Sequence, residues 1–103
     1  MPIGQVSMLR PLPNRVDDFI SRLAESKKIM ERNGAKVSFH RVIAGSEPEG
    51  VLFVSQVADW DAWAKCAAKM AADSEWAALD RKSADDPAAQ IVSGGILQEF
   101  ELP

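Results

Sequence analysis

The chain has 103 residues, of which 47% are hydrophobic and 26% are charged, as in an ordinary globular protein. Its net charge is −3 and no cluster of Lys and Arg forms a basic stripe, so we expect no nucleic-acid partner. The only cysteine, Cys66, excludes an internal disulfide and a cysteine-rich metal site, and a reducing, cytoplasmic location is expected. The N-terminus lacks the pattern of a signal peptide, and no apolar run approaches the roughly 20 residues that span a bilayer.

Residues 3–9 (IGQVSML) form the first predicted strand. Val6 and Met8 fall on one face, and Gln5 and Ser7 fall on the other. The prolines that follow are expected to end the strand, because proline has no N–H to donate to a neighbour.

A helix is predicted over residues 15–33. Asn14 is expected to cap its beginning, and Asn33-Gly34 is a signal for its end. Between them, apolar residues recur at helical spacing, which predicts one face turned to a core.

Residues 36–43 (KVSFHRVI) and 51–57 (VLFVSQV) predict an antiparallel hairpin joined by the turn 44–50. In the first of these strands, Val37 and Phe39 share one face, and Ser38 and His40 share the other. The second strand is apolar on both faces: Leu52 and Val54 oppose Val51, Phe53 and Val57. Such a strand is usually covered on both faces.

Two more helices and a strand complete the chain. Asp59 is expected to cap the first helix, and Ser74 is expected to cap a short one, EWAALDRKS. The apolar ridge of the first of these helices is Trp60, Trp63, Ala67, Met70 and Ala71. Residues 84–93 are predicted to be a polar connection, and Gly94-Gly95 leads into a last strand over 96–102.

The predicted order is β-α-β-β-α-(α)-β over residues 1–103, in a single domain. Two β-α-β halves make an α+β ferredoxin-like sandwich with a four-stranded antiparallel sheet. Helices cover one face of such a sheet, and a second subunit is the simplest cover for the other face, so we expect a homodimer.

This layout resembles the dimeric α+β barrel superfamily, which includes antibiotic-biosynthesis monooxygenase-like, NIPSNAP-like and stress-responsive barrel domains. The resemblance covers essentially the whole chain. It is based on element order, on chain length and on three segments: GAKVSFHRVIAG, EGVLFVSQVADWDAW and SEWAAL. The resemblance implies two sheets packed face to face with the helices outside. It also implies a small-molecule enzyme of the monooxygenase-like kind, which acts without a bound metal or organic cofactor.

His40 is the candidate catalytic residue, because an imidazole can accept or donate a proton near neutral pH. The alternative is a strand histidine that hydrogen-bonds a neighbour or water at a dimer interface. Glu99 and Glu101 are candidate partners for this histidine.

The candidate substrate-binding residues are Ser7, Ser55, Trp63, Met70 and Trp76. The aromatic residues and the methionine would form a flat-walled pocket for an aromatic or polyketide-like ligand, and the serines would add hydrogen bonds. The alternative for the tryptophans is ordinary core packing, because their spacing is that of an amphipathic helix. The sequence therefore leaves two hypotheses open: a cofactor-independent monooxygenase-like enzyme, or a non-catalytic module that binds a small ligand or a partner.

Overall fold

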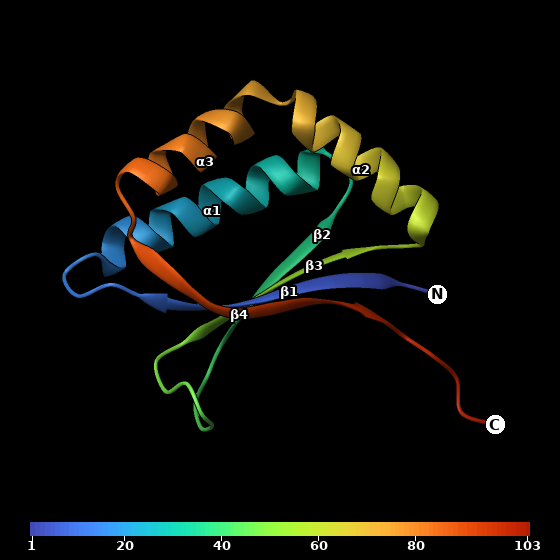
Figure 1. Cartoon of the computed structure of the whole chain (residues 1–103), viewed down its shortest axis with the longest axis horizontal. Helices are drawn as coiled ribbons and strands as arrows, with labels where there is room; N and C mark the ends of the chain where they lie inside the picture. Colours follow the sequence, from blue (N-terminus) through green and yellow to red (C-terminus); the bar gives the residue numbers. More distant parts are fainter.

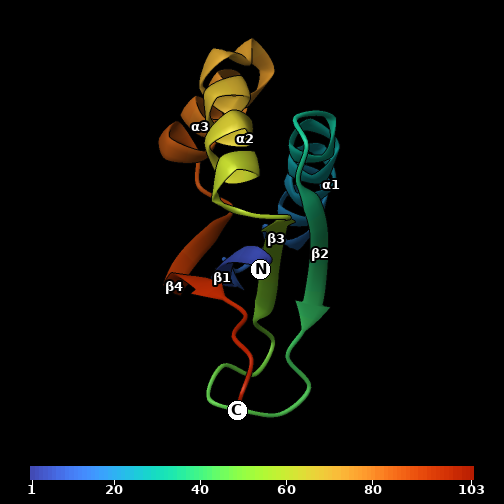
Figure 2. The same cartoon turned by 90° about the vertical axis from the view of Figure 1, so that its right-hand side faces the viewer.

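A computed structural model describes all 103 residues as a four-stranded antiparallel sheet with three helices over one face (Figures 1 and 2). In chain order, the elements are β1 (Ile3–Pro11), α1 (Val16–Arg32), β2 (Lys36–Arg41), β3 (Val51–Val57), α2 (Trp60–Ala72), α3 (Ser74–Asp85) and β4 (Ala89–Gln98). The strands lie in the order β2-β3-β1-β4, so β2 and β4 are the edges. This is the predicted ferredoxin-like α+β arrangement. None of the helices has the length and apolar character needed to cross a membrane.

The strand register divides the sheet into a helix-side face and an open face. Phe39, Phe53 and Ser7 are neighbours across β2, β3 and β1, and both phenylalanines pack against the core under the helices. The adjacent row, His40, Leu52 and Met8, therefore lies on the open face, because side chains alternate along a strand. The predicted assignment of residues to the two faces is confirmed.

The core lies between the sheet and the helices and consists of two small clusters. The larger one is Ile3, Met30, Ala35, Val37 and Val57. The smaller one is Phe19, Leu23 and Ala88. Only 14 of the 103 residues are buried, so the chain by itself hides little of its apolar surface.

Ion pairs fasten α3 to α1. Arg15 places both terminal nitrogens of its guanidinium on the Asp86 carboxylate, at 2.7 and 2.8 Å. Arg22, which is buried, donates to the Asp86 carbonyl at 2.5 Å and to its carboxylate at 3.2 Å. The end of α3 is thereby held over the first half of α1.

The structure corrects two predicted helix caps. The residue that precedes α1 is Arg15, which makes no side-chain capping bond, while Asn14 takes a left-handed backbone with φ of 63°. Asparagine tolerates this conformation well, so the residue serves the turn and not the helix. Asp73, not Ser74, caps α3, because its carboxylate accepts bonds from the next backbone N–H groups. The predicted Asp59 cap and the Gly34 turn, with φ of 104°, are confirmed.

The last strand begins earlier than the sequence predicts. β4 spans Ala89–Gln98, so part of the predicted polar connection is strand, and residues 99–102 are outside it. Gly94 lies inside the strand opposite Ser7, and an added Cβ there would approach the Val6 carbonyl oxygen to 3.0 Å. The glycine therefore permits a close approach of β4 to β1 within the strand, whereas the sequence prediction placed Gly94-Gly95 before the strand.

Candidate ligand-binding site

The structure brings five of the six predicted site residues to one side of the sheet. Ser7 and Ser55 lie on the helix-side face, as their register with Phe53 and Val37 shows. Trp63, Met70 and Trp76 come from α2 and α3 and pack against the larger core cluster. The sixth, His40, lies on the open face, so it is separated from the other five by the sheet itself.

The floor of this side is unusually polar. On the helix-side face of β1, Ile3 and Leu9 pack against the core at the two ends, and Gln5 and Ser7 lie between them, whereas Val6 and Met8 face outward. Gln5 pairs with Ser55 across β1 and β3, so three polar side chains lie together on the helix-side face. The side chains of these three residues form no hydrogen bond within the chain. Their polar atoms keep some contact with solvent, because no fully buried side-chain nitrogen or oxygen lacks a partner. The sequence prediction did not include Gln5 on this face, although its alternation with Val6 was the available signal.

The side chains that α2 and α3 turn toward the sheet form a roof over this face. Asp73, the residue between the two helices, positions this roof. Its carboxylate accepts hydrogen bonds from Arg32 at 2.7 Å and from Asn33 at 2.8 Å, both at the end of α1. These bonds hold the pKa of the Asp73 carboxyl at about 2, below its usual 3.8. The same carboxylate caps α3 by accepting from the N–H groups of Glu75 and Trp76, which fixes the backbone that carries the Trp76 ring.

Met70 and Trp63 are held by neighbouring contacts. The Asn33 amide donates to the Met70 sulfur at 3.3 Å, which ties the end of α2 to α1. The Trp63 ring meets the Trp60 ring edge to face at 6.1 Å between centroids. Asp59 caps α2 through a 2.8 Å bond from the Ala62 N–H. The side chains of the roof are therefore aromatic and apolar. A carboxylate caps the first turn of each of its helices, Asp59 for α2 and Asp73 for α3.

Cys66 lies on α2 among these roof residues. Burial raises the pKa of its thiol above the usual value, and the nearby Lys69 only partly opposes this. A thiol with a raised pKa is a weak nucleophile at neutral pH. Cys66 therefore acts as a small apolar residue of the roof.

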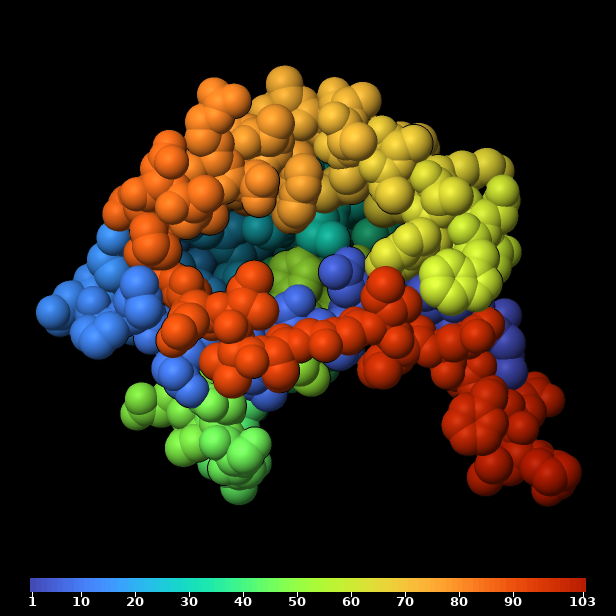
Figure 3. Space-filling view, in the orientation of Figure 1, coloured from blue at the N-terminus to red at the C-terminus, as the bar shows by residue number.

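The space between roof and floor is only partly filled. Figure 3 shows the surface hollowed between the helices α2 and α3 and the strand β4, with β1 and β3 visible at its base. Trp63, Met70 and Trp76 are each partly exposed, and α2 has no buried residue. Opposite Gln5, on β4, Ile96 is 53% exposed. The helices thus cover the β2 and β3 side of the sheet and leave the β4 side open.

His40 has one side-chain partner. Its Nε2 lies 3.0 Å from the Ser38 hydroxyl oxygen on the same strand, and the imidazole is exposed on the open face. Neither of its predicted partners, Glu99 and Glu101, makes a contact with it within the chain; both follow β4, at the opposite edge of the sheet.

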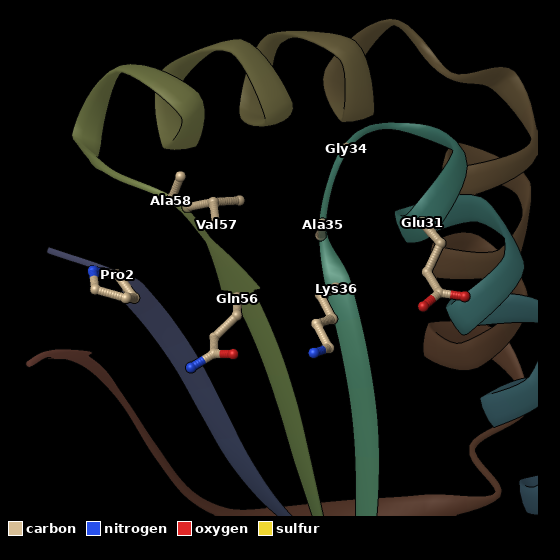
Figure 4. Close-up of a pocket in the computed structure, with 8 residues that line it drawn as sticks. All are labelled: Pro2, Glu31, Gly34, Ala35, Lys36, Gln56, Val57 and Ala58. Atoms are coloured by element: carbon tan, nitrogen blue, oxygen red, sulfur yellow. The ribbon is translucent and has the colours of Figure 1, made fainter.

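Two surface pockets lie elsewhere. One of about 420 Å³ opens where β2 begins and β3 ends, and Figure 4 shows Lys36 and Gln56 side by side there, with Glu31 across β2 on α1. The second, of about 390 Å³, lies between α1 and the β2 edge. None of the six predicted site residues lines either pocket.

Comparisons with known proteins give structural matches only. No family model and no curated protein sequence matches the chain. An uncharacterised NIPSNAP domain protein from Burkholderia xenovorans superposes with a TM-score of 0.71 at 17% identity, over 97% of this chain and 95% of its own. A candidate antibiotic biosynthesis monooxygenase from Chloroflexus aurantiacus gives 0.65 at 11% identity, over 100% and 97%.

SnoaB, a cofactor-independent oxygenase from Streptomyces nogalater, gives a TM-score of 0.67 at 11% identity, over 98% of this chain and 95% of its own. The chain has the fold of the antibiotic-biosynthesis monooxygenase-like and NIPSNAP-like proteins. The predicted resemblance is thereby confirmed at the level of the fold. These neighbours include oxygenases and proteins without an assigned activity, and a fold shared at such low identity does not choose between them.

Proposed function

We propose that the protein is a homodimer that binds a small aromatic or polyketide-like molecule in the hollow between α2, α3 and the sheet. One observation carries the proposal: β1 turns Gln5 and Ser7 toward the helices and Val6 and Met8 outward. The ends of this face, Ile3 and Leu9, are apolar, and a strand that served only to build a core would have apolar side chains at the two central positions as well. Polar groups under an aromatic roof are the combination that orients a small ligand in a mostly apolar pocket.

The outward side of the same strand supports the homodimer. Val6 and Met8 adjoin Leu52 and Val54 on the open face, which makes a central apolar patch on a surface that no helix covers. Large exposed apolar patches are typical of interfaces. The second subunit would cover this patch with its own open face.

For the activity, we propose a cofactor-independent monooxygenase-like reaction. Without a metal or organic cofactor, the electrons for O₂ must come from the substrate itself, so the substrate would be an electron-rich phenol with a CH₂ group in a ring fused to it. One oxygen atom would replace the two hydrogens of a ring CH₂ group as a carbonyl oxygen, and the other would leave with those hydrogens as water. The floor residues Gln5, Ser7 and Ser55 would bind the oxygen atoms of the substrate, while Trp63 and Trp76 would pack on its rings.

A non-catalytic ligand-binding module is the second candidate, and the position of His40 favours it. The only imidazole of the chain is on the far side of the sheet from the hollow, with Ser38 as its side-chain neighbour. In this candidate the hollow binds the ligand, and His40 belongs to the dimer interface. In the enzyme candidate, His40 would have to transfer a proton from the open face, on the opposite side of the sheet from the hollow.

The test begins with native mass spectrometry of the purified protein, which reports the subunit number and any retained molecule. Binding of 1-naphthol, as a simple phenolic probe, is then measured by calorimetry. Trp76→Ala and Gln5→Leu are each expected to weaken binding about tenfold, the loss of one good contact. Ile43→Ala, at an isoleucine that is 86% exposed in the loop after β2, is the control and should leave binding unchanged.

Oxygen consumption with the retained molecule, or with phenols that carry a fused ring CH₂ group if none is retained, separates the two candidates. Loss of turnover in a folded His40→Ala variant supports the enzyme. Binding of 1-naphthol by the wild type without any turnover supports the module. Unchanged binding in both Trp76→Ala and Gln5→Leu would refute the hollow as the site. A monomer at micromolar concentration would refute the homodimer.

A further inference from the structure

The strands that floor the hollow between α2, α3 and the sheet are almost free of charge (Figure 3). Neither β3 nor β4 contains an acidic or a basic residue. β1 contains one, Arg10, whose guanidinium bonds the Glu47 carboxylate. Arg10 follows Leu9, which packs on the helix side, so the Arg10 side chain lies on the open face. The floor of the hollow therefore has polar groups but no ion.

The roof side chains are uncharged as well. Trp63, Cys66 and Met70 lie on the face of α2 that packs against the core, and Trp76 does so from α3. Burial raises the pKa of the Cys66 thiol, so the thiol stays protonated at neutral pH. The hollow thus has aromatic and apolar side chains above it and neutral polar groups below.

The charged side chains of α2 are bound elsewhere or lie on its outer face. Asp61 and Lys65 pair with each other at 2.9 Å, and both are exposed. Lys69 follows Lys65 by one helical turn, so it shares that exposed face. At the end of α2, the Asp73 carboxylate is neutralised by Arg32 of α1 at 2.7 Å. None of these groups supplies a free cation to the hollow.

The charges of α1 and α3 lead to the same result. Arg22 is the only buried charged residue of the chain, and its guanidinium is engaged by the carbonyl and the carboxylate of Asp86. Asp80 follows Trp76 by one helical turn, so it lies on the same side of α3, and it is exposed. The charge that helical spacing places at the rim of the hollow is therefore negative.

Ser55 shows what kind of group the floor lacks. Its side chain is buried, with an exposed fraction of 5%, yet its hydroxyl bonds no other group of the chain. A hydroxyl held away from water without a partner costs free energy, so a group that enters the hollow gains by bonding it. Gln5 is its neighbour across the strands, and an amide can both donate and accept. These two groups suit a carbonyl or a hydroxyl, but they do not replace the hydration of an ion.

We propose that the hollow selects uncharged aromatic ligands with a carbonyl or hydroxyl group and excludes the corresponding carboxylates, with Gln5 as the residue that sets this selectivity. The inference rests on the proposed function, because it names the class of molecule that the same hollow binds. A carboxylate would leave water for a site that has no free cation and has the Asp80 carboxylate at its rim. A neutral ligand of the same shape keeps its hydrogen bonds through Gln5 and Ser55.

Calorimetry with a matched set of ligands tests the selection in the wild-type protein. 1-Naphthamide and 1-naphthoate share one ring system and differ in an NH₂ group and a charged oxygen. At neutral pH, the amide should bind about a hundredfold more tightly, because the anion loses its hydration. Methyl 1-naphthoate, which is neutral and has no N–H, should bind close to the amide. Equal affinities for the amide and the carboxylate would overturn the proposal.

A charge placed in the floor tests the role of Gln5. Gln5→Lys should raise the affinity for 1-naphthoate about tenfold or more and lower that for 1-naphthamide. Gln56→Lys is the matched control, because Gln56 occupies the next register position but lies on the open face. It adds the same charge to the protein and should change neither affinity. An equal gain for 1-naphthoate in both variants would mean that net charge attracts the anion and that Gln5 does not set the selectivity.

Circular dichroism and native mass spectrometry of both variants confirm an unchanged fold and subunit number. The wild-type comparison of the three ligands requires no variant, so it decides the charge selection even if a lysine in the floor prevents folding.

This inference and the proposed function fail in different ways. If 1-naphthamide and 1-naphthoate bind equally and Trp76→Ala weakens both, the charge selection is wrong and the hollow remains the binding site. If neither these ligands nor 1-naphthol bind, both the selection and the proposed site are wrong.

Discussion

Phe53 connects the two core clusters, and its removal should be costly for a residue that is not fully buried. Its ring meets that of Phe39 at 5.1 Å between centroids and 63° between planes. Both rings pack against the cluster around Val37 and also against the cluster around Phe19. Deleting a buried phenylalanine side chain costs about 3–5 kcal/mol. Because Phe53 is only half-buried, Phe53→Ala should lower the free energy of unfolding by about 3 kcal/mol.

Part of this loss should belong to the pair of rings. Edge-to-face aromatic pairs contribute about 0.5–1.5 kcal/mol beyond their buried area. A double-mutant cycle of Phe39→Leu and Phe53→Leu should recover a coupling energy in that range, because leucine keeps most of the apolar volume but not the ring contact.

Urea unfolding followed by tryptophan fluorescence is the assay. All variants are compared at one protein concentration, since the stability of a dimer depends on it. Ile43→Ala, which removes an exposed side chain, is the control and should change the free energy by less than about 0.5 kcal/mol. A loss under about 1 kcal/mol for Phe53→Ala, or no coupling in the cycle, would mean that the two clusters are independent and the reasoning is wrong.

Three further predictions concern the supports of the site. The pKa values of Asp73 and Asp86 are held at about 2, chiefly by hydrogen bonds from Arg32 and Arg15. The pKa of an aspartate in the unfolded chain is 3.8, so the stability that the two carboxylates contribute should be complete above about pH 5 and be lost as the pH falls toward 2. In acid unfolding, Asp86→Asn should therefore lose less stability over this range than the wild type. An unchanged profile would contradict this. Asp59→Ala should cost about 1 kcal/mol in urea unfolding, because α2 loses its cap; a cost within error of zero would count against the cap. Gly94→Ala should lower the melting temperature, because its Cβ would lie 3.0 Å from the Val6 carbonyl oxygen. Gly95→Ala should leave the melting temperature unchanged, because its Cβ would meet nothing within 4 Å. Equal effects of the two substitutions would contradict this reasoning.

Local periodicity was enough to predict most of the elements and their faces. The alternation of Val37 and Phe39 with Ser38 and His40 follows from the geometry of any strand, so it holds without knowledge of the partners. The cap of α2 at Asp59 and the left-handed Gly34 after α1 are also local features. Element order then led to the ferredoxin-like arrangement, because few topologies accommodate it.

Only the tertiary structure decided where β4 begins. Residues 89–93 have no strong strand pattern, and Gly94-Gly95 resembles a break. Pairing with β1 makes this segment a strand, and the glycine opposite Ser7 fits because the two backbones come close there. Similarly, Asp73 caps α3 because it also receives bonds from Arg32 and Asn33, which are about 40 residues away in the chain.

Which of the predicted residues come together in the candidate site also depends on the tertiary structure. The sequence by itself identified Ser7, Ser55, Trp63, Met70 and Trp76 as side chains that could bind a ligand, and His40 as one that could move a proton. It could not say that the sheet separates His40 from the other five, since that depends on which face the helices cover. Periodicity defines two faces for each strand, but only the packing of helices against one of them decides which face is the inside.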